Sequence, residues 1–341
     1  MIRALFKDGD ETLIQDLFYP IIRILREKKA TCFNESLEEK EIVLQTPNEE
    51  ELLRLPAETF LTEAEKLLSY IKSEKGVFSV PTIDSFLNSI HCHSMKASSS
   101  KKTDIQIVLH DYRTKINSEM GFSIKSHLGA DSTLLNASIA TNFTYKVKGI
   151  VLSKKEIEEI NALDSSRKKV IERVERIKEK GGHFLFDKVE NDTFRNNLIL
   201  IDSNMPAIIA HLLLEQFDSN SSKIQDLIIR LTESNPLNYD IKQQSLFYEY
   251  KIKQFLTSAA LGMMPTMSWD GRYDANGGYL VIKKDGEIVC YHFYDKNRFE
   301  DYLFSNTYLE RSSTTRHKYA TLIKEEDGSL SFKLNLQIRL K

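Results

Sequence analysis

Two apolar segments of strand length lie close together in this sequence, and they constrain its fold more than any other feature. IQIVLHD (105–111) and GFSIKS (121–126) are separated by the polar stretch YRTKINSEM. Short apolar runs of this kind, bounded by polar residues, are typical of β-strands. We therefore expect two adjacent strands.

Helical patterns occur on both sides of these strands. Apolar residues recur there at the three- and four-residue spacing of one helix face. The helices expected from this spacing are 13–29, kinked or restarted at Pro20, then 57–76, 81–91, a pair within 153–181, 205–217, 223–234 and 246–264.

Further strands are expected toward both ends of the chain. EIVLQT (41–46) and ELLRLP (51–56) predict a hairpin, although ELLRL alone could be helical. Residues 277–294 predict a second hairpin that turns at Asp285 and Gly286, and 331–341 predict a closing strand. The elements together predict an α/β or α+β fold, in which helices flank a mixed sheet.

The 341 residues are enough for one large domain or two smaller ones. We expect one composite domain with four parts. These are a mainly helical N-terminal part (1–100), the strand pair and the loop that follows it (101–150), a helical part (151–260) and a strand-rich C-terminal part (261–341).

The charge balance excludes a general attraction to polyanions. The chain has 47 basic and 49 acidic residues and a net charge of -2, so any nucleic-acid site must be a local basic patch. Its three cysteines have no close spacing, which fits a reducing cytosol better than a disulfide framework. No stretch resembles a signal peptide or a membrane span, and we expect a soluble cytoplasmic protein.

Three residues in the strand pair have the chemistry of a metal-dependent hydrolase. Asp104 precedes the first strand, and after eighteen intervening residues Ser123 and Lys125 lie at the end of the second. Residues two apart on a strand face the same side, so Ser123 and Lys125 project together. A carboxylate can hold a divalent cation, and an ammonium group can activate water and balance charge on a phosphate. The alternative is a solvated strand-end lysine and an aspartate that caps a turn.

The wider sequence resembles the HpaII family of type II restriction endonucleases. The resemblance is carried by KTDIQIVLHD, GFSIKSHLG with STLLNAS and TNFTYK, NNLILIDS, the segment from YDANGGYLVI to FSNT, RHKYA and KLNLQIRLK. It covers most of the chain. Within this likeness, Asp104, Ser123 and Lys125 resemble the PD-(D/E)xK nuclease motif, with serine in place of the second carboxylate.

The resemblance implies a nuclease-like fold and Mg²⁺-dependent cleavage of double-stranded DNA at a short palindrome. The family is named for an enzyme that cuts within CCGG. Asp104 would coordinate Mg²⁺, with the backbone carbonyl of Ile124 or the side chain of Glu119 completing the ligands. Family members begin with a further helix bearing glutamates, ahead of the first helix expected here.

Two segments are candidates for DNA contact. The loop after Lys125 is rich in small hydroxyl and amide side chains, which suit phosphates and base edges. A second segment carries arginines, which can bind guanine at two atoms in the major groove. The residues expected near DNA are Ser126, Ser132, Thr133, Asn136, Ser138, Thr141, Asn142, Arg311, Arg316 and His317. Both segments could instead be structured surface loops.

The segment WDGRYDANGGYL has the aspartates and glycines of a calcium loop, but it lacks the closing glutamate at the right spacing. We interpret it as a turn before the 277–294 hairpin.

Partners follow from the resemblance. A palindromic site suits a homodimer, and a cognate DNA methyltransferase would protect the host's sites. Two alternatives stay open, which are a sequence-specific DNA-binding protein without cleavage activity and a structure-specific nuclease.

Overall fold

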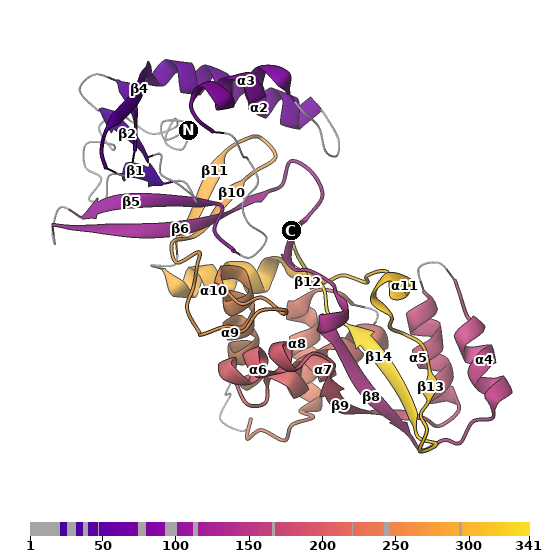
Figure 1. Cartoon of the computed structure of the whole chain (residues 1–341). Coiled ribbons are helices and arrows are strands. Elements are labelled where there is room, and N and C mark those ends of the chain that lie inside the picture. The colour runs from indigo at the N-terminus through magenta and orange to yellow at the C-terminus, as the bar shows by residue number, and fades with distance from the viewer. Residues whose placement is uncertain are drawn as a thin grey trace. The chain divides into compact units, whose positions relative to one another are not determined.

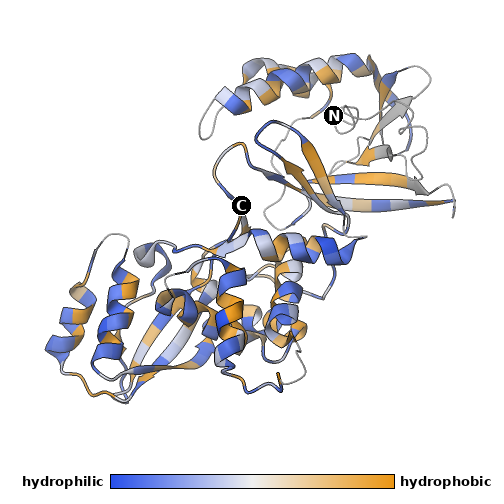
Figure 2. Ribbon diagram, turned by 180° about the vertical axis from the view of Figure 1, so that it is seen from behind, coloured by the Kyte–Doolittle hydropathy of each residue, from blue (hydrophilic) through white to orange (hydrophobic). Residues whose placement is uncertain are grey.

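The computed structural model describes residues 21–25, 32–36, 40–46, 48–73, 80–92, 101–111, 115–165, 168–219, 221–241, 246–292 and 295–341. The chain has a mixed α/β fold in which helices flank several sheets (Figure 1), as expected from the sequence. Hydrophobic and hydrophilic residues alternate along many of the helices (Figure 2), which is typical of helices that bury one face.

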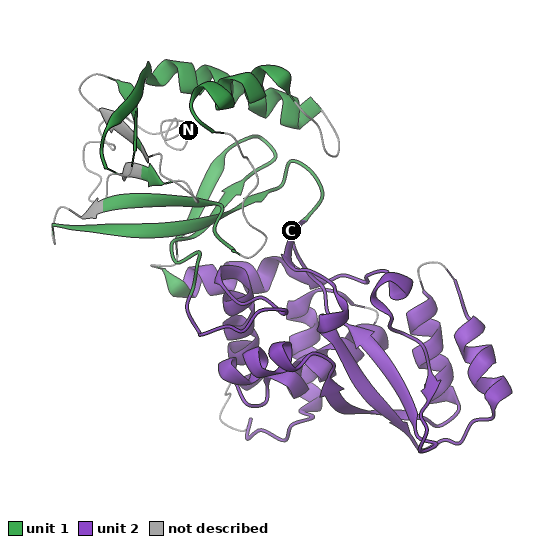
Figure 3. Cartoon of the chain, in the orientation of Figure 1, with its two compact units in different colours: residues 1–131, 273–296 green, residues 132–272, 297–341 purple. Residues whose placement is uncertain are grey.

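The chain divides into two compact units (Figure 3). Unit 1 consists of Met1–Asp131 and Tyr273–Lys296, and unit 2 of Ser132–Arg272 and Asn297–Lys341. The single composite domain expected from the sequence stays a prediction.

Unit 1 is built on an eight-stranded sheet with the order β11-β10-β6-β5-β1-β2-β3-β4. All neighbours are antiparallel except β6 and β10. The strands are β1 (Ile21–Leu25), β2 (Cys32–Ser36), β3 (Glu41–Gln45), β4 (Glu51–Pro56), β5 (Ile105–Asp111), β6 (Ile116–Ser126), β10 (Gly278–Ile282) and β11 (Ile288–His292).

Helix α2 (Ala57–Ser73) packs against this sheet, and helix α3 (Pro81–Ser89) packs against α2, through aromatic side chains. The rings of Phe33 on β2 and Phe60 on α2 are 6.3 Å apart, and those of Phe60 and Phe86 on α3 are 5.4 Å apart, both edge to face. Aromatic pairs of this geometry add to the stability of a core.

The turn before β10 is attached directly to β6. The Gly277 N–H donates to Gly121 O at 2.7 Å, and the Gly121 N–H donates to Asn276 Oδ1 at 2.7 Å. A Cβ on Gly121 would lie 2.4 Å from the backbone oxygen of Asp274, so only glycine permits this approach.

Unit 2 contains two smaller sheets. One has the order β13-β14-β8-β9 and the other β12-β15-β7. These strands are β7 (Ser132–Leu135), β8 (Asn142–Lys148), β9 (His183–Val189), β12 (Thr307–Leu309), β13 (Ile323–Lys324), β14 (Leu330–Asn335) and β15 (Ile338–Leu340). Phe143 and Tyr145 on β8 are fully buried and form part of the core of this unit.

Helices make up the rest of unit 2. They are η2 (Ile139–Thr141), α4 (Lys154–Ala162), α5 (Lys169–Glu179), α6 (Asp192–Ile201), α7 (Met205–Asp218), α8 (Ile224–Ser234), α9 (Phe247–Leu261), α10 (Lys296–Asn306) and α11 (Thr314–His317). Helix α7 carries nine buried residues and packs against α6 and α8. Helix α10 begins at the last residue of unit 1.

The helix expected over 13–29 is wrong where the structure describes it, because Ile21–Leu25 form strand β1. This segment pairs with both β2 and β5, and β-branched residues favour such pairing over a helix. Residues 13–20 and 26–29 lie outside the described residues. The described part of residues 1–100 contains the strands β1 to β4 as well as the helices α2 and α3.

The other expected elements are confirmed in their type. The hairpins β3–β4 and β10–β11 and the pair β5–β6 form as predicted. The expected closing strand is divided into β14 and β15, which belong to different sheets. Strand β9 and helix α6 were not predicted from the sequence.

Across the part of the chain that is described, no single helix has the length and apolar character needed to cross a membrane. Helices α6 and α7 meet that requirement only as a pair, and they are bent by 104° relative to each other.

The close approach at Gly121 makes a testable prediction. Gly121→Ala places a Cβ against the backbone of Asp274, and such overpacking costs about 2 kcal/mol of unfolding free energy. Gly129→Ala is the matched control, because a Cβ there meets nothing within 4 Å. Urea unfolding measures both variants, and equal stabilities would contradict the attachment of the turn to β6.

Candidate active site

The carboxylate of Asp104 is held at the end of β5 by the neighbouring strand β6. The Asp104 N–H donates to Phe122 O at 2.9 Å, which fixes the backbone. Asp104 Oδ2 then accepts hydrogen bonds from Ser123 Oγ at 3.0 Å and from the Ile124 N–H at 2.7 Å. Asp104 is exposed, and these two bonds occupy one carboxylate oxygen, so the other can bind a ligand.

Lys125 lies at the same end of β6. It is partly buried, and its Nζ lies 5.1 Å from the ring centroid of Tyr279. Tyr279 is on β10, where it pairs with Ser123 of β6. Burial lowers the pKa of the Lys125 ammonium, and the attraction of the Asp104 carboxylate opposes this shift. The structure therefore brings Asp104, Ser123 and Lys125 together.

The oxygen atoms at this site suit Mg²⁺. The N–H and C=O of one strand residue point to the same side of the strand. The Ile124 N–H points toward Asp104, so the Ile124 carbonyl faces the same side. Within the described ranges, no group of three or more His, Cys, Asp or Glu residues could hold a metal ion. An ion bound by Asp104 and the Ile124 carbonyl would keep several waters, as Mg²⁺ commonly does.

The register of β6 separates Glu119 from this site. Glu119 pairs with Val108, whereas Phe122 bonds to Asp104. Four residues of strand separate Glu119 from Ser123, a distance of about 13 Å. Glu119 is therefore too far away to complete the ligands of an ion at Asp104.

Two charged residues that were not predicted from the sequence lie near the site. Lys102 is partly buried and has its pKa lowered to about 8, first by burial and then by Lys125. The carboxylates of Asp104 and Asp274 act in the opposite direction. The position of Lys102, two residues before Asp104, was a signal in the sequence, whereas Asp274 lay in a turn with no visible link to β6.

Comparisons with known proteins identify the family. The model of the HpaII restriction endonuclease family matches residues 5–340. The chain belongs to this family. It is 44% identical to the type II restriction enzyme HpaII of Haemophilus parainfluenzae over 334 residues, which is 97% of the chain and 91% of that enzyme. No solved structure matches the chain.

The residues of this HpaII family member that were expected near DNA differ in exposure. Ser126 is on β6 in unit 1, where its Oγ accepts from the Leu128 N–H at 3.2 Å. The others lie in unit 2. Asn136 is exposed, whereas Thr133 accepts from Arg339 at 2.6 Å, and Ser132 and Ser138 are partly buried. Contact of these residues with DNA stays a prediction.

Thr141 and Asn142 are buried and take part in a network centred on Asn335. Asn335 Nδ2 donates to Ser138 O at 2.8 Å and to Asn142 Oδ1 at 2.7 Å, and it also lies 3.1 Å from Thr141 Oγ1. Their polar groups therefore stabilise the fold. Fewer of their hydrogen-bonding atoms are available to DNA than expected.

The same network joins the loop to the second predicted DNA segment. Ser312 Oγ donates to Asn335 Oδ1 at 2.8 Å, and Asn142 Nδ2 donates to His317 O at 2.9 Å. Residues 175 positions apart in sequence thus lie side by side within unit 2. Sequence patterns held no signal for this contact.

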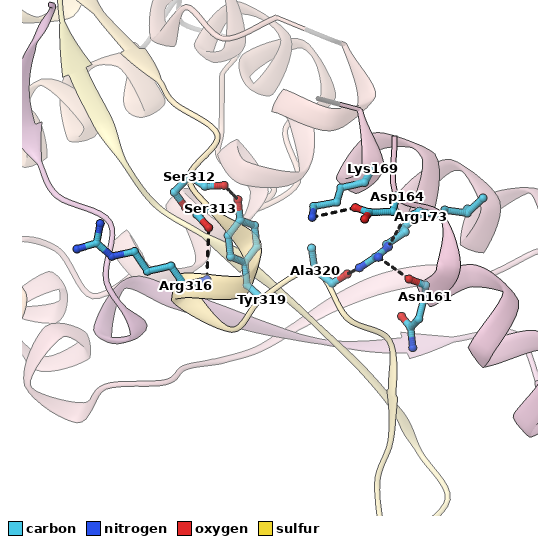
Figure 4. A network of polar contacts seen from close by, with 10 residues as sticks. Asn161, Asp164, Lys169, Arg173, Ser312, Ser313, Arg316, Tyr319 and Ala320 are labelled. Carbon is cyan, nitrogen blue, oxygen red and sulfur yellow. Dashed lines mark hydrogen bonds and ion pairs between the residues drawn. The ribbon is translucent and has the colours of Figure 1, made fainter. Parts of the chain in front are cut away.

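The second segment is also held by the helical pair α4–α5 (Figure 4). Arg173 donates to Ala320 O at 2.6 Å, to Leu163 O at 3.0 Å and to Asn161 O. Ser313 caps α11 by accepting from the Arg316 N–H at 3.3 Å, and Tyr319 donates to Ser312 O at 2.7 Å. These bonds fix the backbone of residues 312–320.

The three residues on this segment that were predicted to contact DNA have different surroundings. Arg316 is exposed and extends away from the network in Figure 4. The guanidinium of Arg311 instead lies 5.7 Å from the ring centroid of Phe217. Burial and then the charge of Arg316 lower the pKa of His317, so its ring is neutral near pH 7. Arg316 therefore offers the most accessible charge.

The Asn335 network predicts a loss of stability. Asn335→Ala leaves Asn142 Oδ1 and Ser312 Oγ without this partner, at a cost of about 2 kcal/mol of unfolding free energy. The control Asn136→Ala, at an exposed position of the same loop, should stay within about 0.5 kcal/mol of the unchanged chain. Chemical denaturation distinguishes them, and a neutral Asn335→Ala would contradict the network.

Proposed function

We propose that the chain is a type II restriction endonuclease that hydrolyses double-stranded DNA at a short palindrome, with CCGG as its target. The observation that carries the proposal is the Asp104 carboxylate, held by Ser123 and the Ile124 N–H beside Lys125, in a chain of the HpaII family. The 44% identity to HpaII supports the choice of target.

Each residue of the site has a role in this reaction. Asp104 and the Ile124 carbonyl would hold Mg²⁺, and Ser123 orients the carboxylate through its hydrogen bond. Mg²⁺, when bound, supplies Lewis-acid polarisation of the phosphoryl group and stabilises the leaving oxygen. Lys125 orients the attacking water as the ammonium or, as the neutral amine, deprotonates it by accepting its proton, and its lowered pKa favours the neutral amine.

DNA binding is assigned to the remaining predicted residues. Arg316 would contact a base edge, because an exposed arginine can bind guanine at two atoms. Arg311 and His317 support it on the same segment. Contacts to phosphates come from Ser126, Ser132, Thr133, Asn136 and Ser138, with Thr141 and Asn142 shaping the loop.

The palindromic target suits a homodimer, because a two-fold protein matches a two-fold site. A cognate DNA methyltransferase would protect the host's own CCGG sites. The enzyme would act in the cytoplasm on incoming DNA.

The serine at position 123 supports a second candidate function, which is sequence-specific DNA binding without cleavage. Ser123 replaces one of the metal-binding carboxylates of the PD-(D/E)xK pattern, and among the described residues no group of three or more His, Cys, Asp or Glu side chains could hold a metal ion. Retained binding of a CCGG duplex in a gel shift, without Mg²⁺-dependent cutting, would favour this candidate.

Lys125→Ala should abolish cleavage and leave binding largely intact. Removal of a group that activates water costs about 100-fold or more in rate. Lys284→Ala is the control, because Lys284 is exposed in the β10–β11 turn. Plasmid cleavage measures the rate and a gel shift measures binding. An undiminished rate for Lys125→Ala would refute the assignment.

The target is tested by digestion of DNA of known sequence, followed by mapping of the ends. We expect discrete fragments whose ends all fall within CCGG and whose formation requires Mg²⁺. Discrete ends at another palindrome would reject the CCGG target but keep the restriction activity. Cutting confined to branched DNA would instead indicate a structure-specific nuclease.

A further inference from the structure

We propose that Lys102 is a second catalytic cation, which contacts the scissile phosphate beside Lys125, and that Asp274 is its positioning residue. This inference rests on the proposed nuclease function and deepens it, because it assigns two residues outside the Asp104, Ser123 and Lys125 motif.

The backbone around Lys102 is fixed against β6. Asp104, two residues later, is bonded to Phe122 through its N–H and to Ile124 through its carboxylate. Thr103, between them, is buried, and a Cβ on Gly121 would lie 2.7 Å from its Oγ1. A lysine on such a short, anchored segment has little freedom to leave the site.

The charges around Lys102 form a cluster of two cations and two carboxylates. Lys102 lies within electrostatic reach of Lys125, Asp104 and Asp274. Both lysines are partly buried, where like charges repel more strongly than in water. An anion placed between the two ammonium groups would relieve this repulsion.

A phosphodiester is the anion that best uses this arrangement. It carries one negative charge in the ground state and gains charge on its non-bridging oxygens during attack by water. Cations that are fixed in advance stabilise the growing charge most, and this lowers the barrier to reaction. Lys125 can then act on the attacking water while Lys102 contacts a non-bridging oxygen of the phosphate.

Asp274 is held next to this cluster by the turn that precedes β10. The turn is bonded to both the N–H and the carbonyl of Gly121, through Asn276 and Gly277. The carboxylate of Asp274 attracts the Lys102 ammonium, as does that of Asp104. Because Asp104 is assigned to the metal ion, Asp274 is left to orient Lys102.

The first experiment compares Lys102→Met, Lys102→Arg and the control Lys101→Met in the full chain. Lys101 is exposed and adjacent. We expect single-turnover cleavage of a CCGG duplex to fall about 100-fold in Lys102→Met. It should fall far less in Lys102→Arg, which keeps the charge, and be unchanged in Lys101→Met.

The second measurement separates phosphate contact from a structural role. DNA affinity is measured in EDTA over a range of salt concentrations. Loss of one phosphate contact reduces the slope of log affinity against log salt by about 0.9. We expect this reduction in Lys102→Met only. A structural role for Lys102 would lower its unfolding temperature and the cleavage rate but leave the slope unchanged.

A double-mutant cycle tests Asp274. If Asp274 acts through Lys102, Asp274→Asn slows cleavage about 10-fold in the otherwise unchanged chain and has little further effect on Lys102→Met. Additive losses would overturn the positioning role and indicate that Asp274 acts independently.

Two outcomes would overturn the proposal for Lys102. They are a normal cleavage rate in Lys102→Met and an unchanged salt slope in that variant. Either result leaves the nuclease function intact provided that the unchanged chain cuts and Lys125→Ala does not. Absence of cutting by the unchanged chain would instead reject the proposed function itself.

Discussion

The site depends on one pair of hydrogen bonds, from Ser123 Oγ and the Ile124 N–H to a single oxygen of Asp104. Hydrogen bonds to a carboxylate are stronger than those between neutral groups, and two of them fix the direction of the side chain. They also join the end of β5 to the end of β6, where Lys125 and the Ile124 carbonyl lie. In the proposed site, Ser123 stands where the PD-(D/E)xK pattern has an acid, and its hydrogen bond orients the Asp104 carboxylate.

Strand β6 connects the other parts of this site. It pairs with β5 on one side and with β10 on the other, and β10 carries Tyr279 beside Lys125. Residues Ser132–Arg272 of unit 2 lie in the sequence between β6 and β10. Parallel neighbours require a long connection. Here that connection contains most of a second unit, which holds most of the residues assigned to DNA.

In unit 2, buried polar residues hold the two segments that are proposed to contact DNA. Asn335 and Arg173 satisfy backbone carbonyls of the loop after β7 and of the segment around α11. Buried polar groups with all their partners make a unique arrangement, since each broken bond leaves an unsatisfied group. The exposed side chains of Asn136 and Arg316 lie on the segments that this network holds. Thr141 and Asn142 have residue types that are common in DNA-binding loops, but they belong to the network itself.

The sequence alone determined the strand pair β5–β6, most of the helices and the grouping of Asp104, Ser123 and Lys125. These features depend on short-range periodicity and on a motif whose members all lie between Asp104 and Lys125. Tertiary structure decided the rest. Ile21–Leu25 became a strand because two other strands were available to pair with it. Gly121 meets Asn276 from 155 positions away, and Asn142 meets Asn335 from 193. Contacts at such separations depend on the packing of the whole chain, and local patterns carry no record of them.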